Sequence, residues 1–216
     1  MKTAAFFDMD LTLVRRNTAT MWLRFLRRRG EIGVVKALRA MTWIAQYKLS
    51  VLDMEAVTAR ASADIRGSSE AEMIEKCLEF TMREVVPHVA PRGRERLAFH
   101  REKGHVVAIL SSSTPYVTEP LARYLGIDHV LCTRLEIAAG RFAGTHVKPA
   151  CYGRGKVHWA ERFAREHEVD LDKSFFYTDS YSDLPMLERV GERVVVNPDP
   201  RLARHARRAG WTVEEW

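Results

Sequence analysis

One short segment near the start of the chain, Phe6-Phe7-Asp8-Met9-Asp10-Leu11-Thr12, restricts both the fold and the chemistry. The apolar residues 4–7 predict a buried strand, and the two carboxylates follow where that strand ends. Alternate side chains of a strand share a face, so Asp8 and Asp10 would crowd each other unless the chain turns or a cation lies between them. Mg²⁺ is usually held by one or two carboxylates together with substrate phosphate, and Thr12 adds a hydroxyl beside that place. The alternative interpretation is a plain acidic turn at a strand end.

Two further apolar segments end in polar residues in the same way. Residues 105–110 predict a buried strand that opens into the hydroxyl-rich run 111–114, and residues 174–178 predict another that opens into Asp179. In open α/β sheets, ligands bind beyond the carboxyl ends of the strands. The three strand ends are therefore expected to meet at one edge of a sheet and to place their polar groups in one site.

A lysine and one more carboxylate complete this set. Lys156 opens a predicted helix directly after the turn Gly153-Arg154-Gly155. Lys148 is the rival, but it stands next to Pro149 and has no helical pattern behind it. Asp183 supplies the second carboxylate after the third strand. We therefore expect Lys156 to be the cation of the site.

In this order the residues resemble the motifs of the haloacid-dehalogenase superfamily of aspartate-nucleophile phosphatases, within it the phosphoserine-phosphatase-like branch with a helical cap. The superfamily pattern is a strand followed by D-x-D-x-T, a second strand ending in Ser or Thr, a Lys, and a third strand ending in an acidic pair. The matching residues of this chain are 8–12, Ser111, Lys156, and Asp179 with Asp183. The four motifs span residues 6 to 183, so the resemblance extends over the whole chain.

The resemblance implies an α/β fold. It predicts a Rossmann-like doubly wound parallel sheet core from residues 1–14 and 87–216, with an inserted helical cap over residues 15–86. A helical pattern from residue 18 to about residue 86 agrees with the cap, and Asp53 and Ser69 are expected to begin helices over 53–66 and 69–85. Caps of this kind close over the substrate and carry specificity. The remaining pattern predicts helices over 92–103 and 115–125, strands over 128–132 and 194–196, and a hairpin of 135–137 with 140–142.

The resemblance also implies a catalytic role for several residues. Asp8 is expected to be the nucleophile that forms an aspartyl-phosphate, and Asp10 the general acid and then the general base. Lys156 and Mg²⁺ are expected to neutralise the negative charge that opposes attack on a phosphate. The residues expected around the metal are Asp8, Asp10 and Asp179; the family analogy puts only the backbone carbonyl of Asp10 on it.

Other residues are expected to contact the substrate or to support the site. The expected substrate-binding residues are Thr12, Asn17, Ser111 and Ser112, with the backbone N–H of Ser113 beside them. Asp183 is expected to orient Lys156 or a metal-bound water. The alternative is that Asp183 complements the dipole of the helix that Ser182 is expected to cap.

The identity of the substrate depends on a departure from the phosphoserine phosphatases. Those enzymes carry a Glu seven residues after the second Asp of the first motif, where it meets the substrate ammonium; here the position is Asn17, preceded by Arg15 and Arg16. Ser182 likewise replaces an Asn of those enzymes. We therefore expect a small phosphorylated metabolite, with histidinol phosphate among the candidates, and keep L-phosphoserine as the alternative.

The charge of the chain supports a hypothesis of a different class. The formal net charge is +6, and arginines cluster at 24–29 and 201–208. Such clusters can bind nucleic acid or anionic lipid, and a helix carrying Trp43 and Tyr47 among basic residues could lie on a membrane surface. Arginines at helical spacing usually form a solvated face. We therefore expect no nucleic-acid partner, and the oligomeric state stays open.

Length and cysteine content place the protein more broadly. A chain of 216 residues with 46% hydrophobic content can bury the core of one domain plus an insertion. A core strand follows Met1-Lys2-Thr3 at once, so no signal peptide is expected, and no long apolar run predicts a transmembrane helix. Three scattered cysteines are expected to be free thiols. These features predict a cytoplasmic protein.

Overall fold

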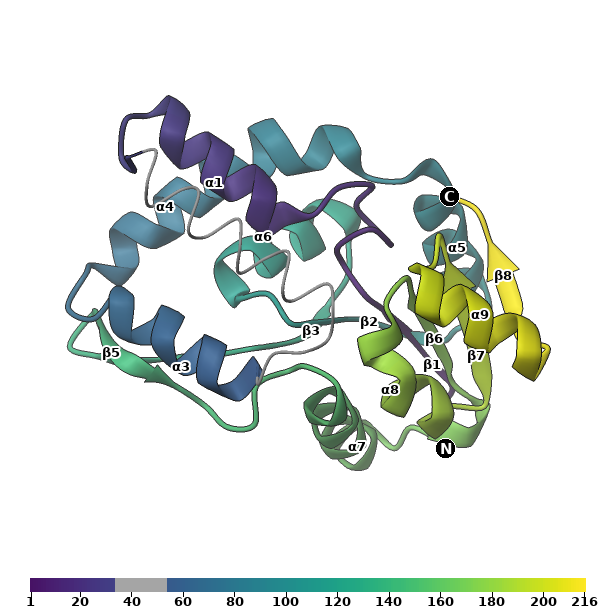
Figure 1. The fold of residues 1–216 in the computed structure, drawn as a ribbon. Helices are drawn as coiled ribbons and strands as arrows, with labels where there is room; N and C mark the ends of the chain where they lie inside the picture. The colour runs from purple at the N-terminus through teal and green to yellow at the C-terminus, as the bar shows by residue number, and fades with distance from the viewer. Residues whose placement is uncertain (34–53) are drawn as a thin grey trace.

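A six-stranded parallel sheet lies at the centre of the computed structural model, which describes residues 1–33 and 54–216 (Figure 1). The strand order is β3-β2-β1-β6-β7-β8, and every neighbouring pair is parallel. The strands are β1 (Ala4–Phe7), β2 (Val106–Ser111), β3 (His129–Cys132), β6 (Phe175–Thr178), β7 (Glu192–Val196) and β8 (Thr212–Glu214). The expected strands of the core are thereby confirmed, and β1 lies in the middle of the sheet.

Helices cover both faces of the sheet because successive side chains of each strand point to opposite sides. Phe7 packs into a cluster with Leu97 of α5 (Pro91–Glu102) and Leu121 of α6 (Pro115–Leu125). Phe6 packs into the cluster on the other face, with α7 (Arg154–His167), α8 (Leu184–Arg189) and α9 (Pro200–Ala209). This arrangement confirms the doubly wound α/β core.

The insertion after the first motif is helical in its described part. It contains α1 (Thr18–Arg28), α3 (Met54–Asp64), α4 (Glu70–Phe80), a π-helical turn (Thr81–Val85) and a 3-10 turn (Val86–His88). Ser69 caps α4 as expected, since its side chain accepts a hydrogen bond of 3.4 Å from the backbone N–H of Glu72. The expected cap Asp53, and the helix with Trp43 and Tyr47, lie outside the described residues. The division into a core and a cap over residues 15–86 stays a prediction.

A two-stranded hairpin from the second half of the chain packs against this insertion. The hairpin consists of β4 (Leu135–Ala138) and β5 (Arg141–His146), as expected, and lies beside α3 in Figure 1. The backbone N–H of Gly67 donates to the carbonyl of Phe142 over 2.8 Å, and the N–H of Phe142 donates to the carbonyl of Ser68 over 3.1 Å. The hairpin therefore ties the inserted helices to the core.

Several details of the chain differ from the expectations. Helix α9 and strand β8 were not predicted. The prediction that Ser182 caps a helix is wrong, because α8 begins at Leu184 with Asp183 at its N-cap position; Ser180 instead caps the short 3-10 turn Tyr181–Asp183. All three cysteines are free and buried, as expected. None of the helices in the described ranges is long and apolar enough to cross a membrane.

Candidate active site

The polar strand ends meet at the carboxyl edge of the sheet. Strands β2, β1 and β6 are neighbours, and their last residues are Ser111, Phe7 and Thr178. Asp8 still belongs to the ladder through its backbone, because its N–H donates to the carbonyl of Tyr177 over 2.9 Å. Asp179 follows Thr178 at the same edge. Parallel pairing of three sequence-distant segments thus brings their polar residues together.

A buried lysine connects two of the carboxylates. The Nζ atom of Lys156 donates to Oδ1 of Asp8 over 2.7 Å and to Oδ2 of Asp183 over 2.7 Å. The hydroxyl of Thr178 also donates to Oδ2 of Asp183, over 2.6 Å. The contact expected between Asp183 and Lys156 is therefore present, and Thr178, which the sequence did not single out, fixes the orientation of Asp183.

The turn before α7 explains why Lys156 reaches this place. Gly153 adopts a φ of +51°, a conformation that glycine tolerates best. A Cβ atom on Gly155 would lie 1.9 Å from the carbonyl oxygen of Ala150, so only glycine allows the backbone to approach this closely. Lys148, the rival, is exposed. The glycine turn therefore delivers Lys156, and not Lys148, to the strand ends.

Burial and the neighbouring charges together raise the pKa values of Asp8, Asp179 and Lys156. Burial raises the pKa of Asp8 to about 7; Lys156 opposes this shift, whereas Asp183 and Asp10 add to it. Burial, together with Asp8 and Asp183, raises the pKa of Asp179 well above its ordinary value. For Lys156, burial lowers the pKa, but Asp183 and Asp8 outweigh it, and the net shift is upward. The lysine is therefore held as an ammonium among carboxylates.

The charge balance of these residues fits a divalent cation. Within the part of the chain that the structure describes, the buried carboxylates of Asp8, Asp179 and Asp183 are accompanied at this edge by one buried ammonium, that of Lys156, which leaves negative charge in excess when all are ionised. In the described ranges, no group of three or more Asp, Glu, His or Cys side chains is arranged to hold a metal. Mg²⁺ does not require such a group, since one or two carboxylates with water and phosphate oxygens suffice. Asp8 and Asp179 could hold it.

Asp10 is directed toward the insertion. Leu11 adopts a φ of +58°, so the chain turns directly after Asp10. The carboxylate of Asp10 then accepts a hydrogen bond of 3.1 Å from Nδ2 of Asn17 and another of 3.1 Å from the backbone N–H of Thr18. These bonds hold both oxygens at the N-terminus of α1, which suits a proton-transfer role better than direct binding of a metal by the side chain.

The side chain of Asn17, an expected substrate-binding residue, is engaged in hydrogen bonds within the protein. Its Oδ1 accepts from the backbone N–H of Thr20 over 3.0 Å and from the hydroxyl of Thr20 over 2.9 Å, so Asn17 caps α1. Its Nδ2 donates to Asp10, as described above. The side chain thus joins the insertion to a carboxylate of the first motif, a role that sequence reasoning missed although Asn is a preferred N-cap residue.

The hydroxyl residues of the site differ in accessibility. Ser111 is buried, and its Oγ accepts from the backbone N–H of Ser113 over 3.2 Å. Ser112 and Ser113 are half-buried and line a cavity together with Asp10 and Asn17. Thr12 is fully enclosed, and its hydroxyl has no hydrogen-bond partner within the described part of the chain. Thr12 is therefore the least accessible of the expected substrate-binding residues.

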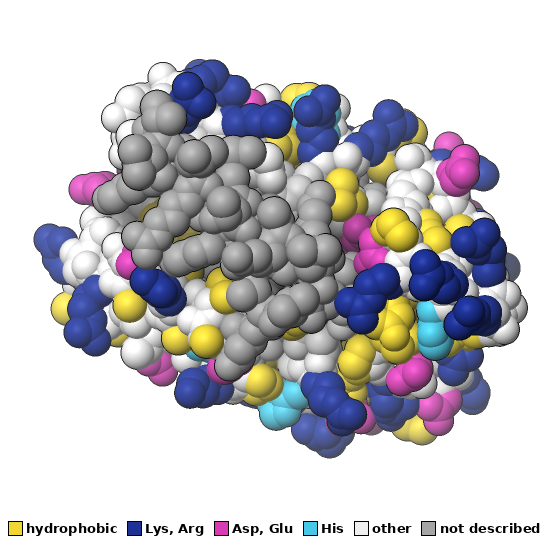
Figure 2. Space-filling view, viewed as in Figure 1, with side chains coloured by type: hydrophobic (Ala, Val, Ile, Leu, Met, Phe, Trp, Pro, Cys, Tyr) yellow, Lys and Arg dark blue, Asp and Glu magenta, His cyan; other side chains and the backbone are white. Residues whose placement is uncertain are grey.

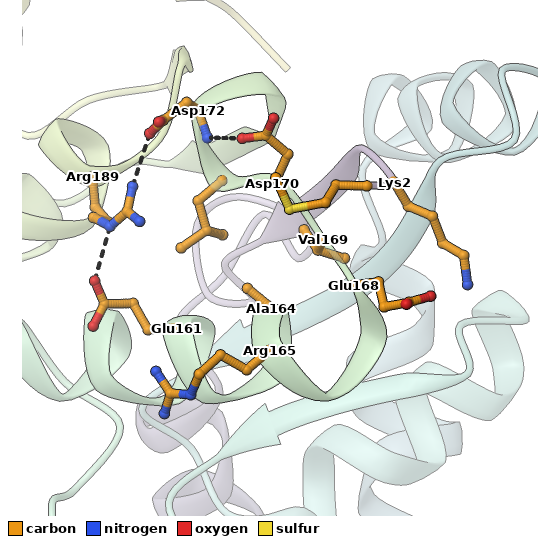
Figure 3. A pocket seen from close by; sticks show the side chains of 11 residues that line it. Lys2, Glu161, Ala164, Arg165, Glu168, Val169, Asp170, Asp172 and Arg189 are labelled. Carbon is orange, nitrogen blue, oxygen red and sulfur yellow. Dashed lines mark hydrogen bonds and ion pairs between the residues drawn. The ribbon is translucent and has the colours of Figure 1, made fainter.

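A larger cavity lies away from this site, at the other end of the sheet. It has a volume of about 950 Å³ and is bordered by residues before β1 and β6, including Lys2 and Asp172 (Figure 3). Arg189 pairs there with Glu161 over 2.9 Å and with Asp172 over 3.0 Å. Its Arg–carboxylate pairs already satisfy one another, and the amino ends of the strands are not where ligands of such sheets bind. We assign no site to it.

Comparisons with known proteins agree with this geometry. The chain is 29% identical to a histidinol-phosphatase of Neisseria meningitidis, over 99% of this chain and 98% of the relative. It is 33% identical to the phosphoserine phosphatase SerB1 of Mycobacterium tuberculosis, over 100% of this chain and 71% of the relative. Its fold is similar to the crystal structure of a Bordetella pertussis protein of unknown function, with a TM-score of 0.88 and 27% identity over 99% of this chain and 98% of the other.

The comparison with protein families covers most of the chain. The sequence profile of the haloacid dehalogenase-like hydrolases matches residues 5–188, a range that includes the strand ends, Lys156 and the acidic pair. The resemblance stated from the motifs is thereby confirmed. This chain belongs to the haloacid dehalogenase-like hydrolase family.

Proposed function

We propose that the protein is a Mg²⁺-dependent phosphomonoesterase that forms an aspartyl-phosphate on Asp8. The observation that carries this proposal is the bond of 2.7 Å from Lys156 to Asp8, with Lys156 also bonded to Asp183 at the carboxyl edge of the sheet. A carboxylate attacks a phosphate dianion poorly because both groups are negative. A cation fixed against the attacking carboxylate reduces that repulsion.

The reaction divides into two steps on this chain's own residues. In the first, an oxygen of Asp8 forms a bond to phosphorus while the bond from phosphorus to the ester oxygen breaks. In the second, water takes the place of the alcohol and releases phosphate from Asp8. When bound by Asp8 and Asp179, Mg²⁺ supplies neutralisation of the phosphoryl charge. The net reaction converts an ester and water into an alcohol and phosphate.

Asp10 is the residue proposed to move protons in both steps. It gives a proton to the leaving alcohol oxygen and then accepts one from the attacking water. The bonds from Asn17 and from the backbone of Thr18 support this proposal, since they fix the direction of the carboxylate. Asp183 positions Lys156, while Ser111, Ser112 and Thr12 are the hydroxyl groups proposed for the phosphoryl side.

We propose a small phosphorylated metabolite as the substrate, with histidinol phosphate among the candidates and L-phosphoserine as the alternative. Two relatives support this class through their names, histidinol-phosphatase and phosphoserine phosphatase. Asn17 brings no negative charge to a substrate ammonium, and its side chain is engaged by Asp10 and Thr20. The three buried free thiols favour a reducing compartment such as the cytoplasm.

The basic surface bears on the alternative that the protein binds nucleic acid. Figure 2 shows Lys and Arg side chains over the part of the molecule where α9 lies. At the C-terminal end of α1, however, Arg28 pairs with Glu84 over 2.6 Å, and Arg29, which follows the helix, pairs with Glu79 over 2.9 Å. Arginines that already face carboxylates are less suited to phosphate backbones. We therefore keep the prediction that nucleic acid is not a partner.

The proposal is tested with a generic ester, p-nitrophenyl phosphate. We expect turnover with Mg²⁺, no turnover in EDTA, and recovery when Mg²⁺ is returned. Beryllium fluoride should inhibit as a phosphoryl mimic and should fail to bind the Asp8→Asn variant. Turnover that survives chelation, or that survives in Asp8→Asn, would remove the basis of the proposal.

A further inference from the structure

A second cavity opens directly on the proposed proton donor. Its volume is about 460 Å³, and Asp10, Asn17 and Ser112 lie in its wall. The other walls come from α1, α3 and α4 of the insertion, from α6, and from the hairpin β4–β5. Its size is in the range of small-molecule sites. The cavity therefore extends from Asp10 and Ser112, where the phosphoryl group is proposed to lie, to a space between the insertion, α6 and the hairpin.

The walls of this cavity are predominantly apolar. The lining includes Trp22 of α1, Val57 of α3, Ile65 in the turn after α3, Met73 of α4 and Phe142 of β5. Trp22, Ile65 and Met73 also pack against the buried cluster on this face of the sheet, so they belong to the folded interior. Among the lining residues that the structure describes, Asp10 is the only one with a charged side chain.

This lining discriminates between classes of alcohol. A buried ammonium or carboxylate without a countercharge or hydrogen bonds is strongly unfavourable. The serine part of phosphoserine carries one of each, and the described walls supply no partner charge except Asp10, which already accepts bonds from Asn17 and Thr18. An apolar group gains free energy from the same surface.

We propose that this cavity receives the alcohol part of the substrate and that this part is uncharged and largely apolar. The proposal rests on the proposed phosphatase function and narrows its substrate class to phosphate monoesters of uncharged, apolar alcohols. It therefore ranks histidinol phosphate and L-phosphoserine, which both carry an ammonium, below such esters. Asp10 stands at the boundary, so its proton reaches the ester oxygen while the carbon part of the leaving group lies among Trp22, Met73 and Phe142.

The test compares ethyl, butyl and hexyl phosphate with 4-aminobutyl phosphate and O-phosphoserine, at one pH and one Mg²⁺ concentration. We expect kcat/KM to rise by up to about fourfold for each added methylene, the value that corresponds to burying one such group. We expect butyl phosphate to exceed 4-aminobutyl phosphate by at least about tenfold. Hexylphosphonate, which cannot be hydrolysed, should inhibit more strongly than ethylphosphonate, again by up to about fourfold for each added methylene.

A matched pair of variants on α3 places the effect in the cavity. Ala61 and Ala59 are both exposed residues of α3, but Ala61 lines the cavity and Ala59 does not. Ala61→Phe should reduce the advantage of hexyl over ethyl phosphate by at least about fivefold, because the ring occupies space that the chain needs. Ala59→Phe should leave the ratio unchanged. Thermal unfolding of both variants checks that they fold.

The outcomes separate the inference from the proposed function. If the esters are hydrolysed at equal kcat/KM whatever the chain length, or if the aminated esters are preferred, the cavity does not select an apolar alcohol, although the phosphatase stands. If no ester is hydrolysed, the proposed function fails. Calorimetric binding of the two phosphonates then decides the inference: equal affinities overturn it, and tighter binding of hexylphosphonate supports it.

Discussion

The two ends of the candidate site differ in almost every physical property. At the phosphate end, Asp8, Lys156 and Asp183 are buried, charged and joined by bonds of 2.7 Å. At the alcohol end, the described walls are mostly apolar, and Trp22 and Met73 are only partly buried. The first end is built from strand ends of the core and the starts of α7 and α8, and the second mostly from the insertion and the hairpin.

This difference matches two separate requirements, action on the phosphoryl group and selection of the alcohol. Charged groups that act on phosphorus need fixed positions, and adjacent parallel strands supply them with little freedom. Selection of an alcohol depends on the shape and polarity of the cavity walls. Side chains of the helices and the hairpin can change these two properties without disturbing the strand ends. Asp10 and Asn17 lie between the two ends and belong to both.

The largest expected effect belongs to the nucleophile. Asp8→Asn should lower kcat on every ester by about 10⁴-fold or more, because an amide cannot form the phosphoryl bond. The loss should be the same for ethyl and hexyl phosphate, since Asp8 acts at the phosphate end alone. Steady-state kinetics on both esters measures this. A loss that depends on chain length would break the proposed separation of the two ends.

Removing the proton donor should have a smaller and more selective effect. Asp10→Asn should cost about 10²–10⁴-fold in rate for an alkyl phosphate, the usual contribution of general acid–base catalysis. The cost should be smaller for p-nitrophenyl phosphate, whose leaving group departs without a proton. The asparagine has a single carbonyl oxygen and can keep one of the two bonds to α1, so the fold should be retained at a cost of about 1 kcal/mol of stability. Equal losses in the bond-breaking step would argue against the acid role.

The glycine turn before α7 should matter through Lys156. Gly155→Ala brings a methyl group against the carbonyl of Ala150, which should cost about 1–3 kcal/mol of stability. Displacement of Lys156 from Asp8 should also lower kcat, by up to about 100-fold. Gly33→Ala is the control, because a Cβ there meets nothing within 4 Å. Denaturant unfolding and kcat are measured together; normal values of both would show that the turn does not position the lysine.

The smallest expected effect concerns the junction between the two ends. Asn17→Ala loses the cap of α1 and the bond to Asp10, and should cost about 1 kcal/mol of stability and about threefold to tenfold in kcat. Asn17→Ser should retain most of the cap but not the bond, and so should lower kcat alone. Ser69→Ala removes the cap of α4 and is the matched control: stability should fall without a change in kcat. An unchanged kcat in both Asn17 variants would show that the bond from Asn17 to Asp10 does not contribute to catalysis.

Much of the core could be predicted because its signals are local. The apolar runs 4–7 and 105–110 predicted two strands, and the structure has β1 at Ala4–Phe7 and β2 at Val106–Ser111, a shift of one residue for the second. Helix α6 begins at Pro115 and ends at Leu125, as the periodicity indicated, with Gly126 in the left-handed conformation that ends a helix. By contrast, β8 has only three residues, none of them fully buried, so no periodic pattern announced it.

The sequence by itself indicated which polar side chains gather at one edge of the sheet. The order of Asp8, Asp10, Lys156 and Asp179 along the chain, each after a recognisable strand or turn, was sufficient for the family and for the edge of the sheet where they meet. Such motifs are readable because each depends on the few residues next to it.

Only the tertiary structure decided which groups touch. The bond from Asn17 to Asp10, the bond from Thr178 to Asp183 and the apolar cavity beside Asp10 all join segments or faces whose meeting no local pattern encodes. The described walls of the cavity come from four helices and two strands packed around one space, and its polarity is the sum of side chains that carry no signal one by one. For that reason, the family could be predicted from the sequence, whereas the proposed kind of alcohol rests on how the insertion packs against the core.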